Sequence, residues 1–117
     1  MKKFFYLSTC DTCKRIMSEL NVTDHIEIQD VKENPISKSD LEELYDLTGS
    51  YEVLFNRRAK LYREKGLHEK SLTETDYKKY ILEHYTFLKR PILVLNHQIF
   101  PGNSKKTVAA AKSAIDE

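Results

Sequence analysis

The sequence is poor in several features that would point to particular classes of protein. Its 117 residues contain only two cysteines, three glycines and three prolines, and no apolar run approaches the ~20 residues that cross a membrane. A formal net charge of +1 gives no electrostatic footprint for duplex nucleic acid or an anionic membrane surface. One C-x-x-C, with no second cysteine pair and no H-x-x-x-H, does not predict a zinc site. We therefore expect one globular domain without a bound metal.

The first residues also lack the full pattern of a secretory signal. Met1-Lys2-Lys3 is followed by an apolar run, but that run ends by Ser8 and no cleavage-site residues follow. We expect a cytoplasmic protein and a monomer. In the cytoplasm a C-x-x-C is more often redox-active or metal-binding than structural.

Both cysteines lie in one motif, Cys10-Asp11-Thr12-Cys13, which follows an apolar run at 4–7 after two residues. A short strand, a brief loop and a helix beginning near Cys10 would place its sulfur at the N-terminal end of that helix. Unpaired backbone N–H groups and the helix dipole favour the thiolate there, and Lys14 and Arg15 add positive charge. We therefore expect Cys10 to have a lowered pKa and to be the nucleophile.

Cys13 has a different pattern around it. Met17 and Leu20 follow at i+4 and i+7, so Cys13 begins the buried stripe of the same helix. It is a possible resolving partner for Cys10. It can equally be an ordinary small core residue, and this alternative stays open.

The hydrophobic pattern predicts the order β-α-β, a helical segment, then β-β-α. Strands are expected at 4–7 and 25–29, the second with Ile26 and Ile28 on one face, and a β-α-β unit makes these strands parallel. The apolar run at 92–95 and a short strand at 98–100 predict a hairpin.

Helices fill the rest of the chain. The segment of about 37–86 is predicted to be helical, with Ser39 and Glu42 as a capping box and Thr73 opening a later helix. The last helix is capped by Asn103 or Ser104. Val108, Ala111 and Ile115 should face inward on it.

This order is that of the thioredoxin fold. Three segments carry a closer resemblance: Leu7-Ser8-Thr9-Cys10-Asp11-Thr12-Cys13-Lys14-Arg15, Leu54-Phe55-Asn56-Arg57-Arg58 and Lys89-Arg90-Pro91-Ile92-Leu93-Val94. In these segments the sequence resembles the ArsC/Spx family, which includes glutaredoxin-coupled arsenate reductases and the Spx regulators. This resemblance implies an α/β, thioredoxin-like fold with a small mixed four-stranded sheet. The whole chain, 1–117, would be one domain with a helical insertion at about 37–86.

The resemblance also implies roles for particular residues. Cys10 matches the family's nucleophile, Arg90 an oxyanion-binding arginine, and Pro91 the proline that packs opposite the site and is cis in thioredoxin folds. Arg58, or its neighbour Arg57, matches another family arginine. Guanidinium groups suit this task because they offer a fork of donors to an oxyanion without risk of deprotonation.

Thr12 and Lys14, in the turn after Cys10, are further candidates for oxyanion binding. The family resemblance implies reduction of arsenate or a related oxidised substrate, with no bound cofactor and with glutathione and glutaredoxin, or thioredoxin, as the external reductant. Two features depart from the arsenate reductases. No arginine follows the last strand, where Lys105 and Lys106 lie instead, and Cys13 is an added cysteine.

Other functions remain open at this point. An Spx-like regulator would bind RNA polymerase and use Cys10 and Cys13 as a redox sensor, with the Lys- and Glu-rich helical segment as the partner surface. That segment can also be an ordinary solvated face. A glutathione-dependent thiol reductase and a domain that has lost activity are the remaining alternatives.

Overall fold

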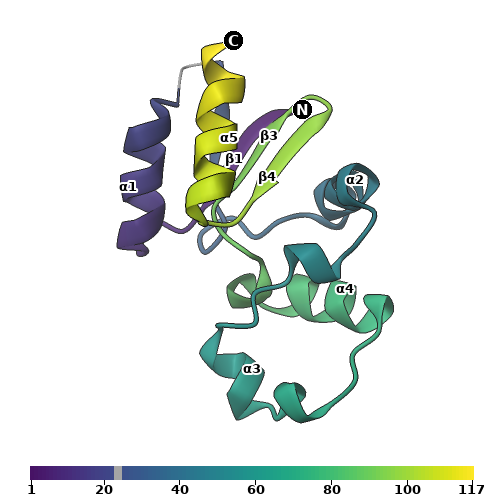
Figure 1. The fold of residues 1–117 in the computed structure, drawn as a ribbon. Coiled ribbons are helices and arrows are strands. Elements are labelled where there is room, and N and C mark those ends of the chain that lie inside the picture. Colours follow the sequence, from purple (N-terminus) through teal and green to yellow (C-terminus); the bar gives the residue numbers. More distant parts are fainter. Residues whose placement is uncertain (23–24) are drawn as a thin grey trace. The chain divides into compact units, whose positions relative to one another are not determined.

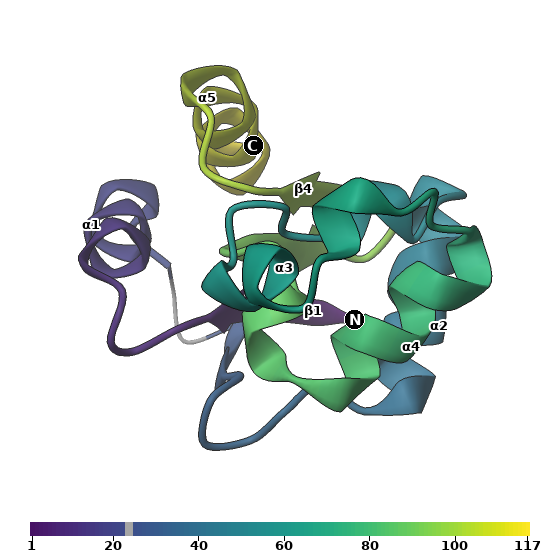
Figure 2. The same ribbon diagram turned by 90° about the horizontal axis from the view of Figure 1, so that it is seen from below.

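The computed structural model describes residues 1–22 and 25–117 (Figures 1 and 2). The chain forms two compact units. One joins Met1–Asn34 to Arg90–Glu117, and the other is Pro35–Lys89. We refer to them as the sheet unit and the helical unit and describe each by itself; the single-domain expectation stays a prediction.

The sheet unit contains the mixed four-stranded sheet that the sequence predicted. Its strands lie in the order β2-β1-β3-β4, and they are β1 (Lys2–Tyr6), β2 (Glu27–Asp30), β3 (Ile92–Leu95) and β4 (Gln98–Pro101). β1 runs parallel to β2 and antiparallel to β3, and β3 and β4 form the predicted hairpin.

Two helices, α1 (Asp11–Leu20) and α5 (Lys105–Asp116), lie side by side over one face of this sheet (Figure 2). The core between helices and sheet consists of Phe4, Ile16, Leu20, Ile26, Leu93 and Ala111. Val108 and Ile115 pack against it, as predicted for the last helix. Met17 packs against this core as predicted, and Ile16, at i+3 from Cys13, is more deeply buried than Met17.

The second strand is shorter than predicted and sits at the edge of the sheet. Ile28 pairs with Phe4 but leaves 47% of its surface exposed, because β2 has a neighbour on one side only. Ile26 is buried just before the strand begins. Gln29 is buried too, and its Nε2 donates to the carbonyl of Asn34 at 2.7 Å.

The helical unit is made of short helices, as the sequence predicted for this segment. They are α2 (Lys38–Thr48), η1 (Glu52–Leu54), α3 (Lys60–Glu64), η2 (Leu67–Glu69), α4 (Glu74–Glu83) and η3 (Tyr85–Phe87), with η marking single 3-10 turns. The rings of Phe55 and Phe87 stack at 5.4 Å in its core, and Tyr77 lies 4.9 Å from Phe55.

The helix ends explain where these elements start and stop. Thr73 and Asp76 form a complete capping box at the start of α4. The predicted cap at Ser39 is wrong: Ser37 caps α2, and its hydroxyl accepts from the Asp40 N–H at 3.0 Å. Gly49 ends α2 with φ 72°, a conformation that costs glycine nothing. None of the helices in the described residues has both the length and the apolar character needed to cross a membrane.

Candidate active site at the start of α1

Cys10 is the residue directly before α1, where the sequence placed it. Its backbone is extended (φ −101°, ψ 111°), its N–H donates to the Leu7 carbonyl at 3.0 Å, and its own carbonyl accepts from Lys14 at 3.2 Å. The backbone N–H groups of Thr12 and Cys13 face its sulfur and favour the thiolate. The start of α1 thus offers its unpaired donors to a sulfur atom.

The two thiols of the motif have opposite pKa shifts. Burial raises the pKa of Cys10, but the Cys13 N–H, the Cys13 thiol and the charge of Arg90 outweigh it, and the net result is a lowered pKa. Cys13 is fully buried, and burial is the main reason that its pKa rises to about 11. At neutral pH Cys10 therefore has the larger thiolate fraction, in the direction that the sequence predicted.

Arg90 and Pro91 precede β3 and complete the site within the sheet unit. The Arg90–Pro91 peptide bond is cis, and the Pro91 carbonyl accepts from the Gly102 N–H at 2.8 Å. The charge of Arg90 lowers the pKa of both cysteines. The guanidinium therefore acts on the same two sulfurs that the motif brings together.

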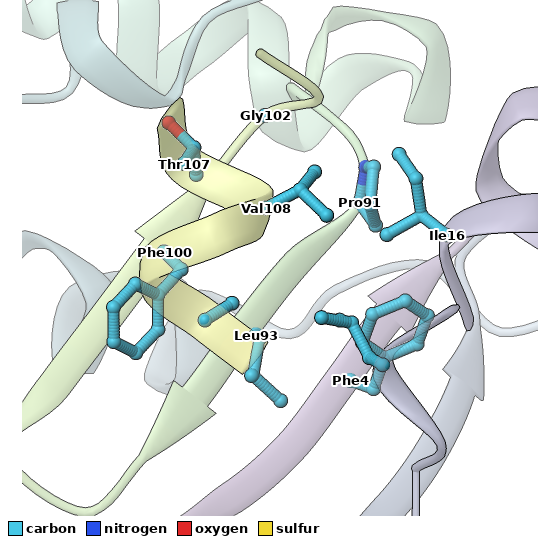
Figure 3. Close-up of a pocket in the computed structure, with 10 residues that line it drawn as sticks. Phe4, Ile16, Pro91, Leu93, Phe100, Gly102, Thr107 and Val108 are labelled. Carbon is cyan, nitrogen blue, oxygen red and sulfur yellow. The ribbon is translucent and has the colours of Figure 1, made fainter. Parts of the chain in front are cut away.

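A small apolar pocket lies beneath Pro91, toward the helix-covered face (Figure 3). It spans about 190 Å³, part of it open to solvent, and is lined by Phe4, Ile16, Leu20, Pro91, Leu93, Phe100, Gly102, Thr107, Val108 and Ala111. Neither cysteine lines it. Its walls belong mostly to the core between α1, α5 and the sheet, so we assign it to packing and not to substrate binding.

The loop that carries Cys10 has a partner that the sequence reasoning missed. Asp30, at the end of β2, accepts hydrogen bonds from both the N–H and the hydroxyl of Ser8. These bonds, with that from the Lys32 N–H, hold the pKa of Asp30 below its ordinary value against the effect of burial. The predicted parallel pairing of β1 and β2 was the sequence signal that pointed to this region, because it places the last residues of both strands, Tyr6 and Asp30, side by side.

Arg57 and Arg58 belong to the helical unit, where they have different surroundings. The Arg57 guanidinium donates to the Glu52 carboxylate and to the Tyr77 hydroxyl, the latter at 3.0 Å. The Arg58 backbone N–H donates to the Asn56 side chain at 3.1 Å. Among the residues that the structure describes, no side-chain partner of the Arg58 guanidinium is found.

Lys89 lies close enough to Arg57 and Arg58 for their charges to act on it. Its N–H donates to the Leu54 carbonyl at 2.8 Å, beside the bridge that pairs Phe55 with Leu88. Burial lowers the pKa of Lys89, and the charges of Arg57 and Arg58 lower it further.

The other predicted site residues lie near the helix starts of the sheet unit. Thr12 contributes its N–H to Cys10, and the Lys14 side chain is exposed on the first turn of α1. Lys105 and Lys106 are exposed on the first turn of α5, which Ser104 caps. In the described ranges no group of three or more His, Cys, Asp or Glu residues could hold a metal ion.

A mixed sheet in the order β2-β1-β3-β4, a cysteine at the start of α1 and a cis-proline before β3 define a thioredoxin-like thiol protein. More narrowly, the chain belongs to the ArsC family, whose sequence profile matches residues 5–111. A comparison with curated proteins found no match.

Solved structures agree with this fold. An ArsC family related protein from Bacteroides fragilis superposes with a TM-score of 0.76 at 20% identity, over 94% of this chain and 96% of that one. An arsenate reductase from Vibrio cholerae superposes with a TM-score of 0.76 at 20% identity, over 94% of this chain and 96% of that one. An arsenate reductase (ArsC) related protein from Brucella melitensis superposes with a TM-score of 0.70 at 19% identity, over 93% of this chain and 92% of that one. At these identities the similarity establishes the fold alone.

Proposed function

We propose that this protein is a thiol-dependent reductase in which the Cys10 thiolate attacks arsenate or a related oxidised substrate. The observation that carries the proposal is the lowered pKa of Cys10, at a helix start and under the charge of Arg90. Membership of the ArsC family and a fold shared with arsenate reductases support a reductase-like role.

The reaction proceeds through a bond between sulfur and arsenic. The thiolate attacks As(V), one oxygen leaves as water after protonation, and an S–As bond forms. A second thiol then attacks the Cys10 sulfur, and the electron pair of the S–As bond passes to arsenic. The products are As(III) and a disulfide on Cys10. Two thiols are thereby oxidised by two electrons, which balances the reduction of As(V).

The second thiol is better supplied from outside than by Cys13. Cys13 is buried and its pKa is raised to about 11, so little of it is thiolate at neutral pH. Glutathione is therefore the proposed attacking thiol, and glutaredoxin, or thioredoxin, would reduce the resulting disulfide. No bound cofactor is required. The proposed setting is the cytoplasm, with the protein as a monomer.

The oxyanion is proposed to bind to Arg90, with help from Thr12 and Lys14, and the family resemblance implies a further role in oxyanion binding for Arg58. Its negative charge would repel the Cys10 thiolate unless cations and backbone donors offset that repulsion. Arg58 is preferred to Arg57 because the Arg57 guanidinium is already engaged by Glu52 and Tyr77. Lys105 and Lys106 lack the planar fork of the arginine that arsenate reductases have after the last strand.

The test is arsenate-dependent consumption of NADPH with glutathione, glutaredoxin and glutathione reductase. We expect wild type and Cys13→Ser to turn over and Cys10→Ser to be inactive. Turnover that also requires Cys13 would replace glutathione by Cys13 as the second thiol. No turnover in wild type would refute the arsenate substrate and leave a glutathione-dependent thiol reductase as the next candidate.

The contact between the Cys10 and Cys13 thiols favours one second candidate, an Spx-like redox sensor that binds RNA polymerase. A disulfide between these residues would be the oxidised state of the switch. A pull-down with reduced and oxidised protein tests it. Capture of polymerase subunits that depends on both cysteines would support the regulator, and capture in neither state would refute it.

A further inference from the structure

We infer that Asp30 is a positioning residue for the nucleophile: its carboxylate fixes the loop at Ser8 so that the Cys10 sulfur stays against the N–H groups of the first turn of α1. The inference rests on the proposed role of Cys10 as the nucleophile. Asp30 itself touches neither the sulfur nor any group that we place around the oxyanion.

The carboxylate of Asp30 holds two backbone segments at once. Oδ1 accepts from the Ser8 N–H at 3.3 Å and from the Lys32 N–H at 3.2 Å, and Oδ2 accepts from the Ser8 hydroxyl. Just beside it, the Val31 N–H donates to the Tyr6 carbonyl at 2.9 Å and extends the parallel pairing of β1 with β2. The carboxylate is therefore anchored to the sheet on one side and to the loop on the other.

Ser8 lies two residues before the nucleophile, in a loop with few other restraints. The Cys10 N–H donates to the Leu7 carbonyl at 3.0 Å and closes the loop, the Leu7 N–H bonds to the Cys13 sulfur, and Thr9 at the tip of the loop is exposed. Loss of the carboxylate would remove both bonds that Asp30 makes with Ser8 and leave the loop held only through the backbone of Leu7 and Cys10. The sulfur could then turn away from the N–H groups of Thr12 and Cys13 that favour its thiolate.

Asp30 acts through geometry and not through its own charge. A carboxylate near a thiolate would by itself raise the pKa of the thiol. The groups with the largest influence on Cys10 are Cys13, Arg90 and Thr12, together with burial. Removal of Asp30 should consequently make Cys10 a weaker acid, although simple removal of a negative charge predicts the opposite change.

The experiment measures the rate at which iodoacetamide alkylates Cys10 as a function of pH in the full chain. For Asp30→Ala we expect the apparent pKa of Cys10 to rise, with about threefold less thiolate at neutral pH for a rise of half a unit. Asp30→Asn keeps one acceptor oxygen and should shift the profile less. Ser8→Ala loses only the hydroxyl bond and should shift it in the same direction, which keeps the test available if Asp30→Ala fails to fold.

Ser104→Ala is the matched control in the same unit. The Ser104 hydroxyl caps α5 by accepting from the Thr107 N–H at 3.1 Å. Its removal should lower the free energy of unfolding without moving the pH profile of Cys10 alkylation. An unchanged profile in the Asp30 and Ser8 variants, or a shift to lower pKa, would overturn the inference. The readout needs no arsenate. A shifted profile without arsenate turnover in wild type refutes the proposed substrate and leaves the positioning role standing.

Discussion

The Cys10 and Cys13 thiols interact at the start of α1, so the ionisation of one cysteine bears on the other. The contact lowers the pKa of Cys10 and raises that of Cys13. Two groups coupled in this way lose their protons in two steps that belong to the pair. The first proton leaves mainly from Cys10, which is partly exposed, since Cys13 is fully buried.

Cys10 should react with iodoacetamide near neutral pH much faster than Cys13. The pKa of Cys10 is lowered and Cys10 lies at the N-terminal end of α1, whereas burial raises the pKa of Cys13. Mass spectrometry of the alkylated peptide at successive times measures both rates. Equal rates at the two cysteines would remove the case for an activated nucleophile.

A pair of variants at Cys13 separates its hydrogen bond from its burial. Cys13→Ser keeps a donor to the Cys10 sulfur, whereas Cys13→Ala removes it. We expect the Cys10 pKa to rise more in Cys13→Ala than in Cys13→Ser. The same rise in both variants would mean that the Cys13 side chain contributes no hydrogen bond to the thiolate.

Arg90 should affect both the thiol and the oxyanion, and two substitutions divide these effects. Arg90→Lys keeps the charge that lowers the pKa of Cys10 but loses the planar fork, so alkylation should change little while arsenate turnover falls about tenfold or more. Arg90→Gln should slow both. Urea unfolding of each variant is the control, and unchanged turnover in Arg90→Lys would place Arg90 outside the site.

Substitutions at Arg57 and Arg58 should distinguish a residue that stabilises the helical unit from one that binds the oxyanion. Arg57→Gln loses the bonds to Glu52 and Tyr77 and should lower the free energy of unfolding by about 1 kcal/mol with little effect on turnover. Arg58→Gln should lower turnover with little effect on unfolding. The reverse pattern in the two variants would assign oxyanion binding to Arg57.

The raised pKa of Cys13 also has a consequence for stability at high pH. The folded chain keeps this proton to about pH 11, whereas an ordinary cysteine releases it near 9.0. The folded state therefore binds more protons over this range, and the free energy of unfolding should fall as the pH rises from 9 to 11, by at most about 3 kcal/mol.

Cys13→Ser lacks this titration and should show a flatter dependence on pH. Urea unfolding under reducing conditions at pH 8 and pH 10.5 compares the two proteins. The lowered pKa of Cys10 adds stability that is lost as the pH falls through its folded value and is complete only above its unfolded value of 9.0, so between pH 8 and 9 it makes the free energy of unfolding rise with pH. Both proteins retain Cys10, so the difference between their two curves reports the titration of Cys13. Parallel curves would show that Cys13 is not buried as described.

The order of elements and the place of the cysteines could be predicted from sequence because both depend on local patterns. Alternating or continuous apolar residues mark the strands, and the short loop before Cys10 fixes its position at a helix start. The Asp30–Ser8 contact could not be derived this way. It joins residues 22 positions apart and depends on which residues of the two parallel strands pair, whereas the alternation of apolar residues fixes only the face that each side chain takes.

The same limit explains the error at the start of α2. Ser37 and Ser39 are both good capping residues, and only Ser39 has a glutamate three positions later, so the local pattern favoured the wrong one. The structure starts α2 at Lys38, which makes Ser37 the cap and places Ser39 inside the first turn.

Substitution of the two serines decides between these helix starts. Ser37→Ala removes the hydroxyl that accepts from the Asp40 N–H at 3.0 Å and should lower the free energy of unfolding by about 1 kcal/mol. Ser39→Ala should cost nothing, or stabilise slightly, because alanine is the better helix former inside a helix. Urea unfolding of both variants against wild type makes the comparison. A larger loss in Ser39→Ala than in Ser37→Ala would mean that α2 begins two residues later than described.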